Sequence, residues 1–178
     1  MPPRPILRFP DPRLREKAAP VAVFDAALAA LADDLLATLR AAPGIGIAAP
    51  HVGVALRLVV IELSPADGVR VYVNPVIEWA CADLARAEEG SVSMPGVAES
   101  VERPARVRVA WQDLTGAARR EEADGLLAVC LQHEIDQLDG IFWIQRLSRL
   151  KRERAAARFA KLERERALGG VRANRRGP

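Results

Sequence analysis

The stretch from Leu126 to Gly140 constrains this chain most, because it combines an apolar helix pattern with a dense group of polar residues. Many zinc hydrolases use the pattern His-Glu-x-x-His, which places two imidazoles one helical turn apart beside a Glu that acts as general base. His133 and Glu134 supply the first two positions, but Gln137 stands where the second imidazole is needed. The stretch therefore predicts the helix that carries the chemistry, and it leaves open whether a metal binds there.

Length and composition indicate an ordinary globular protein. With 178 residues, 28% of them charged, the chain is long enough for one domain with a real core. We expect that domain over residues 1–168 and a disordered basic tail over 169–178. There is no run of about 18 apolar residues and no apolar signal-peptide core, and two cysteines do not make a disulfide framework. These features predict a cytoplasmic protein that does not enter a membrane.

Charge is distributed unevenly along the chain. Residues 146–178 contain twelve Lys and Arg against three Asp and Glu, a net charge of +9, whereas the rest of the chain has a net charge of −6. A basic segment of this kind is typical of a polyanion-binding surface. On charge alone, a solvated helix face is an equally good interpretation.

Hydrophobic spacing and turn residues predict the other elements. Helices are expected over 25–41, with Asp25 as N-cap, over 126–138, and over about 148–168, where the glycine pair at 169–170 ends the last one. Strands are expected over 56–63, 69–73 and 106–111. The polar, glycine-rich segment 88–96 is typical of a loop when taken alone.

Two further motifs precede the motif helix. Gly44–His51 has the sequence GIGIAAPH, and Glu89–Ser93 has the sequence EGSVS. Together with Gln132–Gly140, in this order and spacing, they make the chain resemble the peptide deformylase family from about Arg4 to Arg166. The motifs of that family are G-x-G-x-A-A-x-Q, E-G-C-x-S and Q-H-E-x-D-H-x-x-G.

The resemblance implies both a fold and a reaction. The fold is α+β, with mixed, mostly antiparallel β-structure around the motif helix and a helix at the C-terminal end. The reaction is removal of the N-formyl group from methionine on nascent chains, by a water that a metal ion activates. The resemblance also implies that the basic last helix docks on the ribosome, where rRNA phosphates would supply the polyanion.

The metal ligands are the positions at which this chain departs from the family. His133 matches one ligand, whereas Ser91 and Gln137 stand where a Cys and a second His are expected. A serine hydroxyl keeps its proton at neutral pH, and an amide oxygen is neutral, so both are weaker donors than a thiolate and an imidazole. We therefore expect no tightly bound metal; any ion that does bind is expected to be one divalent iron, zinc or nickel.

The catalytic and substrate-binding positions are better matched. Glu134 matches the general acid/base, the backbone N–H of Val92 matches one oxyanion donor, and Ile45 and Gly46 match the peptide-binding loop. His51 stands where the family has a Gln that stabilises the oxyanion. Without a metal, Glu134 would face a water with a pKa of about 15.7 instead of about 7. We therefore expect deformylation to be lost or strongly reduced, with binding of N-formylmethionyl or related peptides retained.

Two alternatives stay open. In the first, the chain is an active hydrolase whose metal site is rebuilt from His51, His133 and the carboxylate of Glu134 or Asp136. In the second, the fold serves as a partner or regulator of an active paralogue.

We assign no catalytic or metal-binding role to several other side chains. Cys81 is a poor substitute for the missing thiolate, and Cys130 on the apolar helix is typical of a core residue. Arg103 and its charged neighbours are expected on the surface. Val97 and Ala98 stand where many members of the family contact substrate, so the part of the site beyond the methionine is expected to differ.

Overall fold

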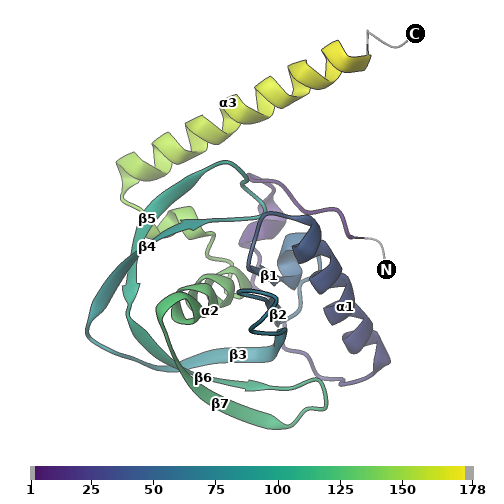
Figure 1. Ribbon diagram of the computed structural model, residues 1–178, viewed down its shortest axis with the longest axis vertical. Helices are drawn as coiled ribbons and strands as arrows, with labels where there is room; N and C mark the ends of the chain where they lie inside the picture. Colours follow the sequence, from purple (N-terminus) through teal and green to yellow (C-terminus); the bar gives the residue numbers. More distant parts are fainter. Residues whose placement is uncertain (1–2, 175–178) are drawn as a thin grey trace.

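Helix α2 (Gly125–Leu138), which carries the third motif, lies in the interior with strands on several sides (Figure 1). This computed structural model describes residues 3–174, the last six by their backbone alone. Leu131, Ile135 and Leu138 of α2 share one hydrophobic cluster with residues of all five strands of the larger sheet. An apolar helix buries its surface in this way, and the predicted motif helix is therefore confirmed.

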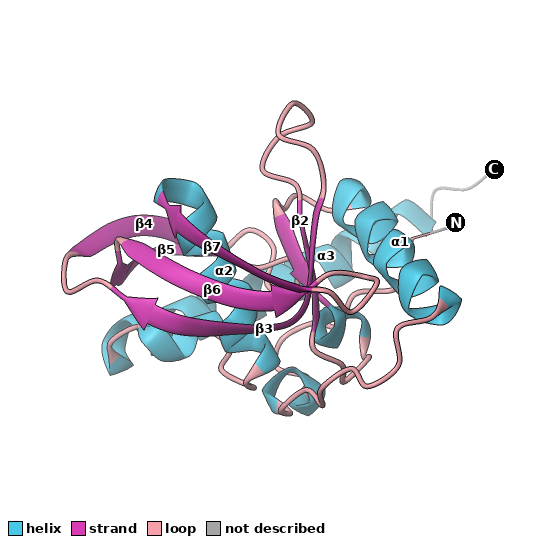
Figure 2. Cartoon of the chain, turned by 90° about the horizontal axis from the view of Figure 1, so that it is seen from below, coloured by secondary structure: helices cyan, strands magenta, loops and turns pink. Residues whose placement is uncertain are grey.

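The strands form two antiparallel sheets. The larger has the order β1-β2-β3-β6-β7, with β1 (Gly46–Ala48), β2 (Leu58–Ile61), β3 (Arg70–Ala80), β6 (Arg106–Gln112) and β7 (Ala118–Asp124). The smaller is the hairpin of β4 (Leu84–Gly90) and β5 (Ala98–Pro104). All pairings between these strands are antiparallel, and Figure 2 shows β3, β6 and β7 as curved, neighbouring strands. The predicted α+β fold is therefore confirmed.

Helix α1 (Ala26–Ala41) covers a second cluster, which includes Leu58 and Val60 of β2. The Asp25 side chain accepts hydrogen bonds from the first-turn N–H groups of Ala27 and Leu28, as an N-cap residue does. The predicted helix and its cap are confirmed. The apolar residues that face the cluster are spaced by three or four: Leu28, Leu31, Leu35 and Leu39.

Helix α3 (Arg149–Asn174) crosses above the β4–β5 hairpin and extends past the rest of the molecule (Figure 1). Its Ala155 and Phe159 belong to a third cluster, with residues of the N-terminal segment and of the segment before α3. The predicted end at Gly169–Gly170 is wrong, because the helix continues to Asn174. A glycine costs a helix only about 1 kcal/mol and removes no hydrogen bond. Residues 175–178 of the predicted tail lie outside the described residues.

The remaining differences concern the strands. β3 is longer than the predicted strand 69–73, and β4, β5 and β7 are strands where the sequence predicts none. Short 3-10 helices η1 (Pro12–Arg15), η2 (Ala49–Val52) and η3 (Trp143–Arg146) occupy connecting segments. No helix within residues 3–174 is long and apolar enough to cross a bilayer.

Candidate functional site

A cavity of about 820 Å³ opens between β1, the end of β4, the loop after it, and α2. All three motifs contribute to its wall, so the structure brings together residues that lie up to ninety positions apart in the chain. Seven of the eight site residues predicted from the sequence line this cavity, and Gln137 is the exception. The seven are Ile45, Gly46, His51, Ser91, Val92, His133 and Glu134.

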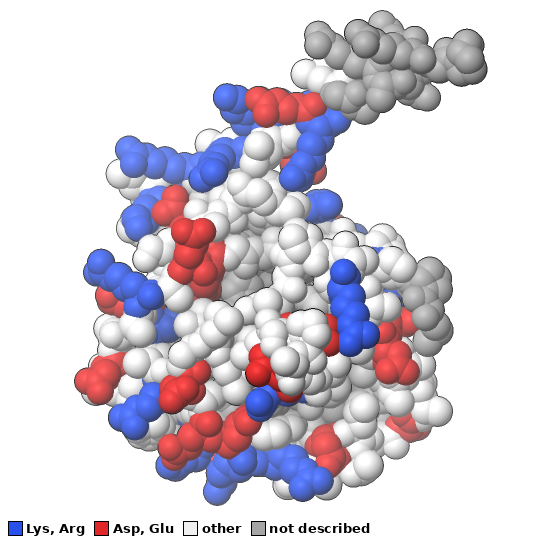
Figure 3. Space-filling model, in the orientation of Figure 1, with Lys and Arg blue, Asp and Glu red and all other residues white. Residues whose placement is uncertain are grey.

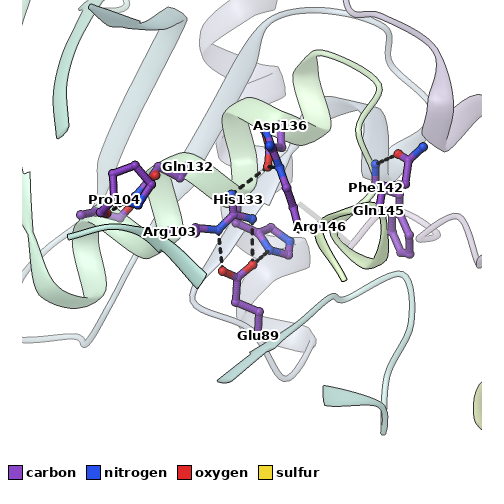
Figure 4. A network of polar contacts seen from close by, with 10 residues as sticks. Glu89, Arg103, Pro104, Gln132, His133, Asp136, Phe142, Gln145 and Arg146 are labelled. Carbon is purple, nitrogen blue, oxygen red and sulfur yellow. Dashed lines mark hydrogen bonds and ion pairs between the residues drawn. The ribbon is translucent and has the colours of Figure 1, made fainter. Parts of the chain in front are cut away.

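A buried network of charges holds His133 in place (Figure 4). The Nδ1 of His133 on α2 donates to the Glu89 carboxylate at 2.9 Å. Arg103 of β5 binds both oxygens of the same carboxylate, at 2.5 and 2.9 Å, and also donates to Asp136 at 2.8 Å. Arg146 of η3 binds both carboxylate oxygens of Asp136. The network therefore ties α2 to the β4–β5 hairpin and to the segment that leads into α3.

The sequence predicted Arg103 as a surface charge. This prediction is wrong, because only 5% of its side chain is exposed. Burial alone would raise the pKa of Glu89, but the hydrogen bonds and charges of His133 and Arg103 lower it to about 2. Burial alone would lower the pKa of His133, yet its hydrogen bond to Glu89 and the charges of Glu134 and Glu89 raise it. The network therefore favours an ionised Glu89 and a protonated His133.

Ser91 lies in a tight turn directly after β4. Its Oγ accepts the Ser93 N–H at 3.1 Å, and its backbone carbonyl accepts the Met94 N–H at 2.9 Å. The turn leaves the Ser91 side chain in the cavity wall. The neighbouring Val92 buries its side chain against the Gly44 backbone, so that a Cβ added to Gly44 would come within 2.8 Å of Val92 Cγ1.

Gln137 does not line the cavity. Its Nε2 donates to the backbone carbonyl of Leu14 at 2.7 Å, and only 1% of the residue is exposed. The carbonyl of Leu138 accepts the Ala18 N–H close by, at 2.8 Å. Gln137 thus fastens the N-terminal segment to the end of α2, which is a structural role that the sequence did not predict.

His51 is buried at the end of the first motif, with 1% exposed. The Ala48 N–H donates to its Nδ1 at 3.0 Å, so Nδ1 carries no proton and Nε2 carries one. Burial and the charge of His133 lower the pKa of His51 to about 3, so the ring is neutral. The contact of 3.8 Å between His51 Nδ1 and Glu134 Oε2 is therefore not an ion pair.

Glu134 is 3% exposed and projects from α2 into the same wall. Burial, together with the charge of Glu89, raises its pKa to about 7 against the opposing charges of His133 and Arg103. Its Oε1 lies so close to Gly46 that a Cβ there would come within 2.7 Å. Among the described residues, neither Glu134 Oε2 nor His51 Nε2 has a hydrogen-bond partner.

The residues at the three predicted ligand positions do not fit a tightly held zinc or iron ion. His133 offers one imidazole and Ser91 one hydroxyl, while Gln137 does not line the cavity, its amide nitrogen donates to the Leu14 carbonyl, and its amide oxygen is a neutral, weak donor. Imidazole and thiolate donors are what these ions need. Within the part of the chain that the structure describes, no three His, Cys, Asp or Glu side chains converge as a ligand group. The alternative site of His51, His133 and a carboxylate is therefore not assembled.

Two residues to which the sequence gave no catalytic or binding role also line the cavity. Cys130, interpreted as a core residue, is buried and contributes to the wall one helical turn before Glu134, and burial raises the pKa of its thiol. The i, i+4 spacing on one helix face could have indicated this position. Arg158 reaches the cavity from α3. Cys81 is elsewhere, bonded to the backbone of Asp83 and Arg106.

Comparison with known proteins agrees with the fold and the motifs. A sequence model of the family described as "Polypeptide deformylase" matches residues 3–153. A "Peptide deformylase-like" protein of Brucella melitensis is 63% identical over 161 residues, which are 90% of this chain and 98% of that protein. A "Peptide deformylase" of Mesorhizobium japonicum is 45% identical, covering 95% and 98%.

Solved structures give the same result. A peptide deformylase from Legionella pneumophila is 40% identical and has a TM-score of 0.88, covering 99% of each chain. A peptide deformylase from Synechococcus elongatus, solved in complex with actinonin, is 40% identical with a TM-score of 0.85, covering 89% of this chain and 88% of that one. From its fold, its three motifs and these matches, the chain belongs to the peptide deformylase family.

Proposed function

We propose that this protein binds the N-terminal part of peptides in the deformylase cavity and has lost, or strongly reduced, metal-dependent deformylation. The observation that carries the proposal is the Gln137 side chain, which donates to Leu14 instead of entering the cavity. The family uses a divalent metal, and in this chain a single imidazole, that of His133, stands among the three ligand positions.

Retention of peptide binding is supported by the parts of the site that do not depend on a metal. β1 pairs with β2 along one edge, and Gly46 of β1 and the preceding Ile45 line the cavity, where an extended peptide can add as a further strand. Leu126 and Val129 form an apolar part of the wall that suits a methionine side chain. The Glu89–Arg103 network keeps these walls together.

Metal analysis and a deformylation assay test the proposal. The purified protein is expected to hold far less than one zinc, iron or nickel ion per chain and to release no formate from a formyl-methionyl tripeptide. A triple variant, Ser91→Cys with Gln137→His and His51→Gln, is expected to bind about one ion and to release formate. One ion per chain and formate release by the unmodified protein would contradict the proposal.

A second proposal concerns α3, because its exposed cations form a surface suited to rRNA phosphates. Figure 3 shows Lys and Arg side chains grouped along this helix. Removing the helix would be a poor test, since Ala155 and Phe159 are part of the core. Charge reversal at exposed positions is cleaner: Arg154→Glu with Lys161→Glu and Arg164→Glu should weaken ribosome co-sedimentation and reduce its salt dependence.

The matched control reverses three cations far from α3 in the chain: Arg86→Glu with Arg119→Glu and Arg120→Glu, all of them on the hairpin strands β4 and β7. This variant changes the net charge by the same amount. It should leave co-sedimentation close to that of the unmodified protein. Equal losses for the two variants would show that net charge, and not α3, is responsible.

A further inference from the structure

Helix α3 packs against the loop between β4 and β5 and contributes one cation to the cavity. Arg166 Nη2 donates to the backbone carbonyl of Pro95 at 3.4 Å. Phe159 is buried in the same hydrophobic cluster as Val97. These contacts hold α3 against the loop that forms this side of the wall. Among the α3 residues whose side chains the structure describes, Arg158 alone lines the cavity.

The positive charge of Arg158 has no partner within the protein. Several other cations of α3 are paired on the helix itself: Arg149 binds Glu153 at 2.8 Å, and Lys161 lies 3.9 Å from Glu165. No described carboxylate lies within ion-pair distance of Arg158, whose side chain is exposed. A guanidinium group can bind a carboxylate through two parallel hydrogen bonds. An unpaired one in a cavity wall is therefore suited to a carboxylate of the ligand.

The part of the wall next to Arg158 has small, apolar side chains. Val97 is 3% exposed, and Ala98, the first residue of β5, has only a methyl group. Neither side chain can make a hydrogen bond or an ion pair with a ligand. Because Phe159 packs in the cluster that contains Val97, the preceding Arg158 enters the wall on this same side. A charged contact to the ligand on this side therefore comes from α3.

Most other charges in the wall are committed to the protein. The Glu89 carboxylate is bound by Arg103 and His133. Glu88 is the second exposed charged residue in the wall, and its sign is opposite to that of Arg158. Successive side chains of a strand point to opposite faces, so Glu88 points away from the face on which Glu89 meets α2. The two exposed charges make opposite predictions for the ligand, and a titration separates them.

We propose that Arg158 determines specificity by binding an acidic side chain at the second or third position of a peptide in the cavity. The inference rests on the peptide binding proposed above and adds the class of peptide that is preferred. An extended chain advances by about 3.3 Å per residue, so the residues directly after the first one come within reach of the exposed part of the wall. Helix α3 is then a wall of the peptide site as well as a basic surface.

Calorimetric titration with tripeptide amides tests the proposal, because amidation leaves the side chain as the sole carboxylate. The peptides are the amides of formyl-Met-Ala-Asp and formyl-Met-Asp-Ala, the same two with Asn in place of Asp, and formyl-Met-Ala-Lys. At low ionic strength, one of the Asp peptides is expected to bind about three- to fivefold more tightly than its Asn counterpart. Raising the salt concentration to about 0.5 M should bring this ratio close to one, because salt screens an exposed ion pair.

The outcomes of this titration separate the inference from the proposed function. Equal affinities of the Asp and Asn peptides at both positions would overturn the inference and leave peptide binding standing. Tightest binding of the Lys peptide would assign the selection to Glu88 and would also overturn it. Absence of binding to all five peptides would overturn the proposed function together with the inference.

Substitutions at Arg158 assign the preference to its guanidinium group. Arg158→Gln should abolish the preference for the Asp peptide, while the affinity for the Asn peptide stays within about twofold. Arg158→Lys keeps the charge but not the paired donors, and it should retain part of the preference. The matched control is Arg149→Gln, which removes one cation from the same helix at a side chain that is 91% exposed and outside the cavity wall. A preference that survives in Arg158→Gln, or that Arg149→Gln removes equally, would overturn the inference.

Discussion

Arg103 is the residue on which the buried charges around His133 depend. It neutralises Glu89 and also donates to Asp136, in a position with 5% of the side chain exposed. Removing one partner of a buried ion pair leaves the other charge without compensation, which is strongly destabilising. The residue therefore stabilises the site before any ligand binds.

Arg103→Ala should consequently lower the free energy of unfolding by about 3–5 kcal/mol. Urea denaturation followed by circular dichroism measures the loss. Arg106→Ala, an exposed arginine three positions along the chain, is the matched control and should change the value by less than about 0.5 kcal/mol. Similar losses for both variants would mean that the network adds no stability.

Glu134 makes stability depend on pH around neutrality. Its pKa is about 7 in the folded protein against an ordinary value of 4.5, so the folded state holds the proton more tightly. A carboxyl group with a raised pKa contributes its full stability below about pH 4.5, and this contribution is lost as the pH rises towards 7. The loss is up to about 3 kcal/mol, at 1.36 kcal/mol for each unit of pKa.

Glu134→Gln should remove this pH dependence. Urea unfolding of both proteins at several pH values between 4.5 and 7.5 is the measurement. The difference in free energy of unfolding, variant minus unmodified protein, should increase as the pH rises. Two curves that run parallel over this range would contradict the raised pKa.

At the scale of the elements, β1 and α2 approach each other closely at Gly46, in the wall of the cavity. A Cβ at this position would lie 2.6 Å from Cys130 Sγ, which is closer than such atoms come. Gly46→Ala should therefore destabilise the protein, and Cys130→Ala should relieve part of the clash. A double-mutant cycle by urea unfolding should give a coupling free energy of about 1 kcal/mol or more. Additive effects would show that the two elements adjust independently.

The elements that could be predicted from the sequence are those with regular hydrophobic spacing. α1, α2 and β6 have it, and all three were predicted close to their observed bounds. β7 has the sequence ARREEAD, which has no regular hydrophobic spacing. This strand is stabilised instead by cross-strand ion pairs such as Arg108 with Glu122. A strand whose side chains pair by charge cannot be recognised before its partner strand is known.

The same limit applies to the candidate site. The motifs predicted seven of the lining residues, because the family resemblance fixes which segments meet. Arg103 was misplaced because its partners, Glu89 and Asp136, come from other elements. The direction of Gln137 could not be predicted either, since it depends on a backbone carbonyl 123 positions earlier in the chain.

At the scale of the whole molecule, α3 is part of the folded body as well as a basic surface. Phe159 is buried in the third cluster, and its ring lies 6.3 Å from that of Phe9 in the N-terminal segment. Phe159→Ala should lower the free energy of unfolding by about 3–5 kcal/mol. Leu150→Ala, at a position 57% exposed on the same helix, is the control and should change it by less than about 0.5 kcal/mol. A small effect of Phe159→Ala would mean that α3 is only loosely attached.

The hydrogen bond from Gln137 to Leu14 has a consequence for any return to metal chemistry. A histidine at this position could not direct its imidazole into the cavity and also replace the amide donor of Gln137 at the Leu14 carbonyl. A histidine introduced at this position would therefore leave the buried Leu14 carbonyl without its donor, although Leu7, Phe9 and Ala18 would still be hydrogen-bonded to the body of the protein. Restoring the imidazole alone would thus lower the stability of the segment that packs against the end of α2.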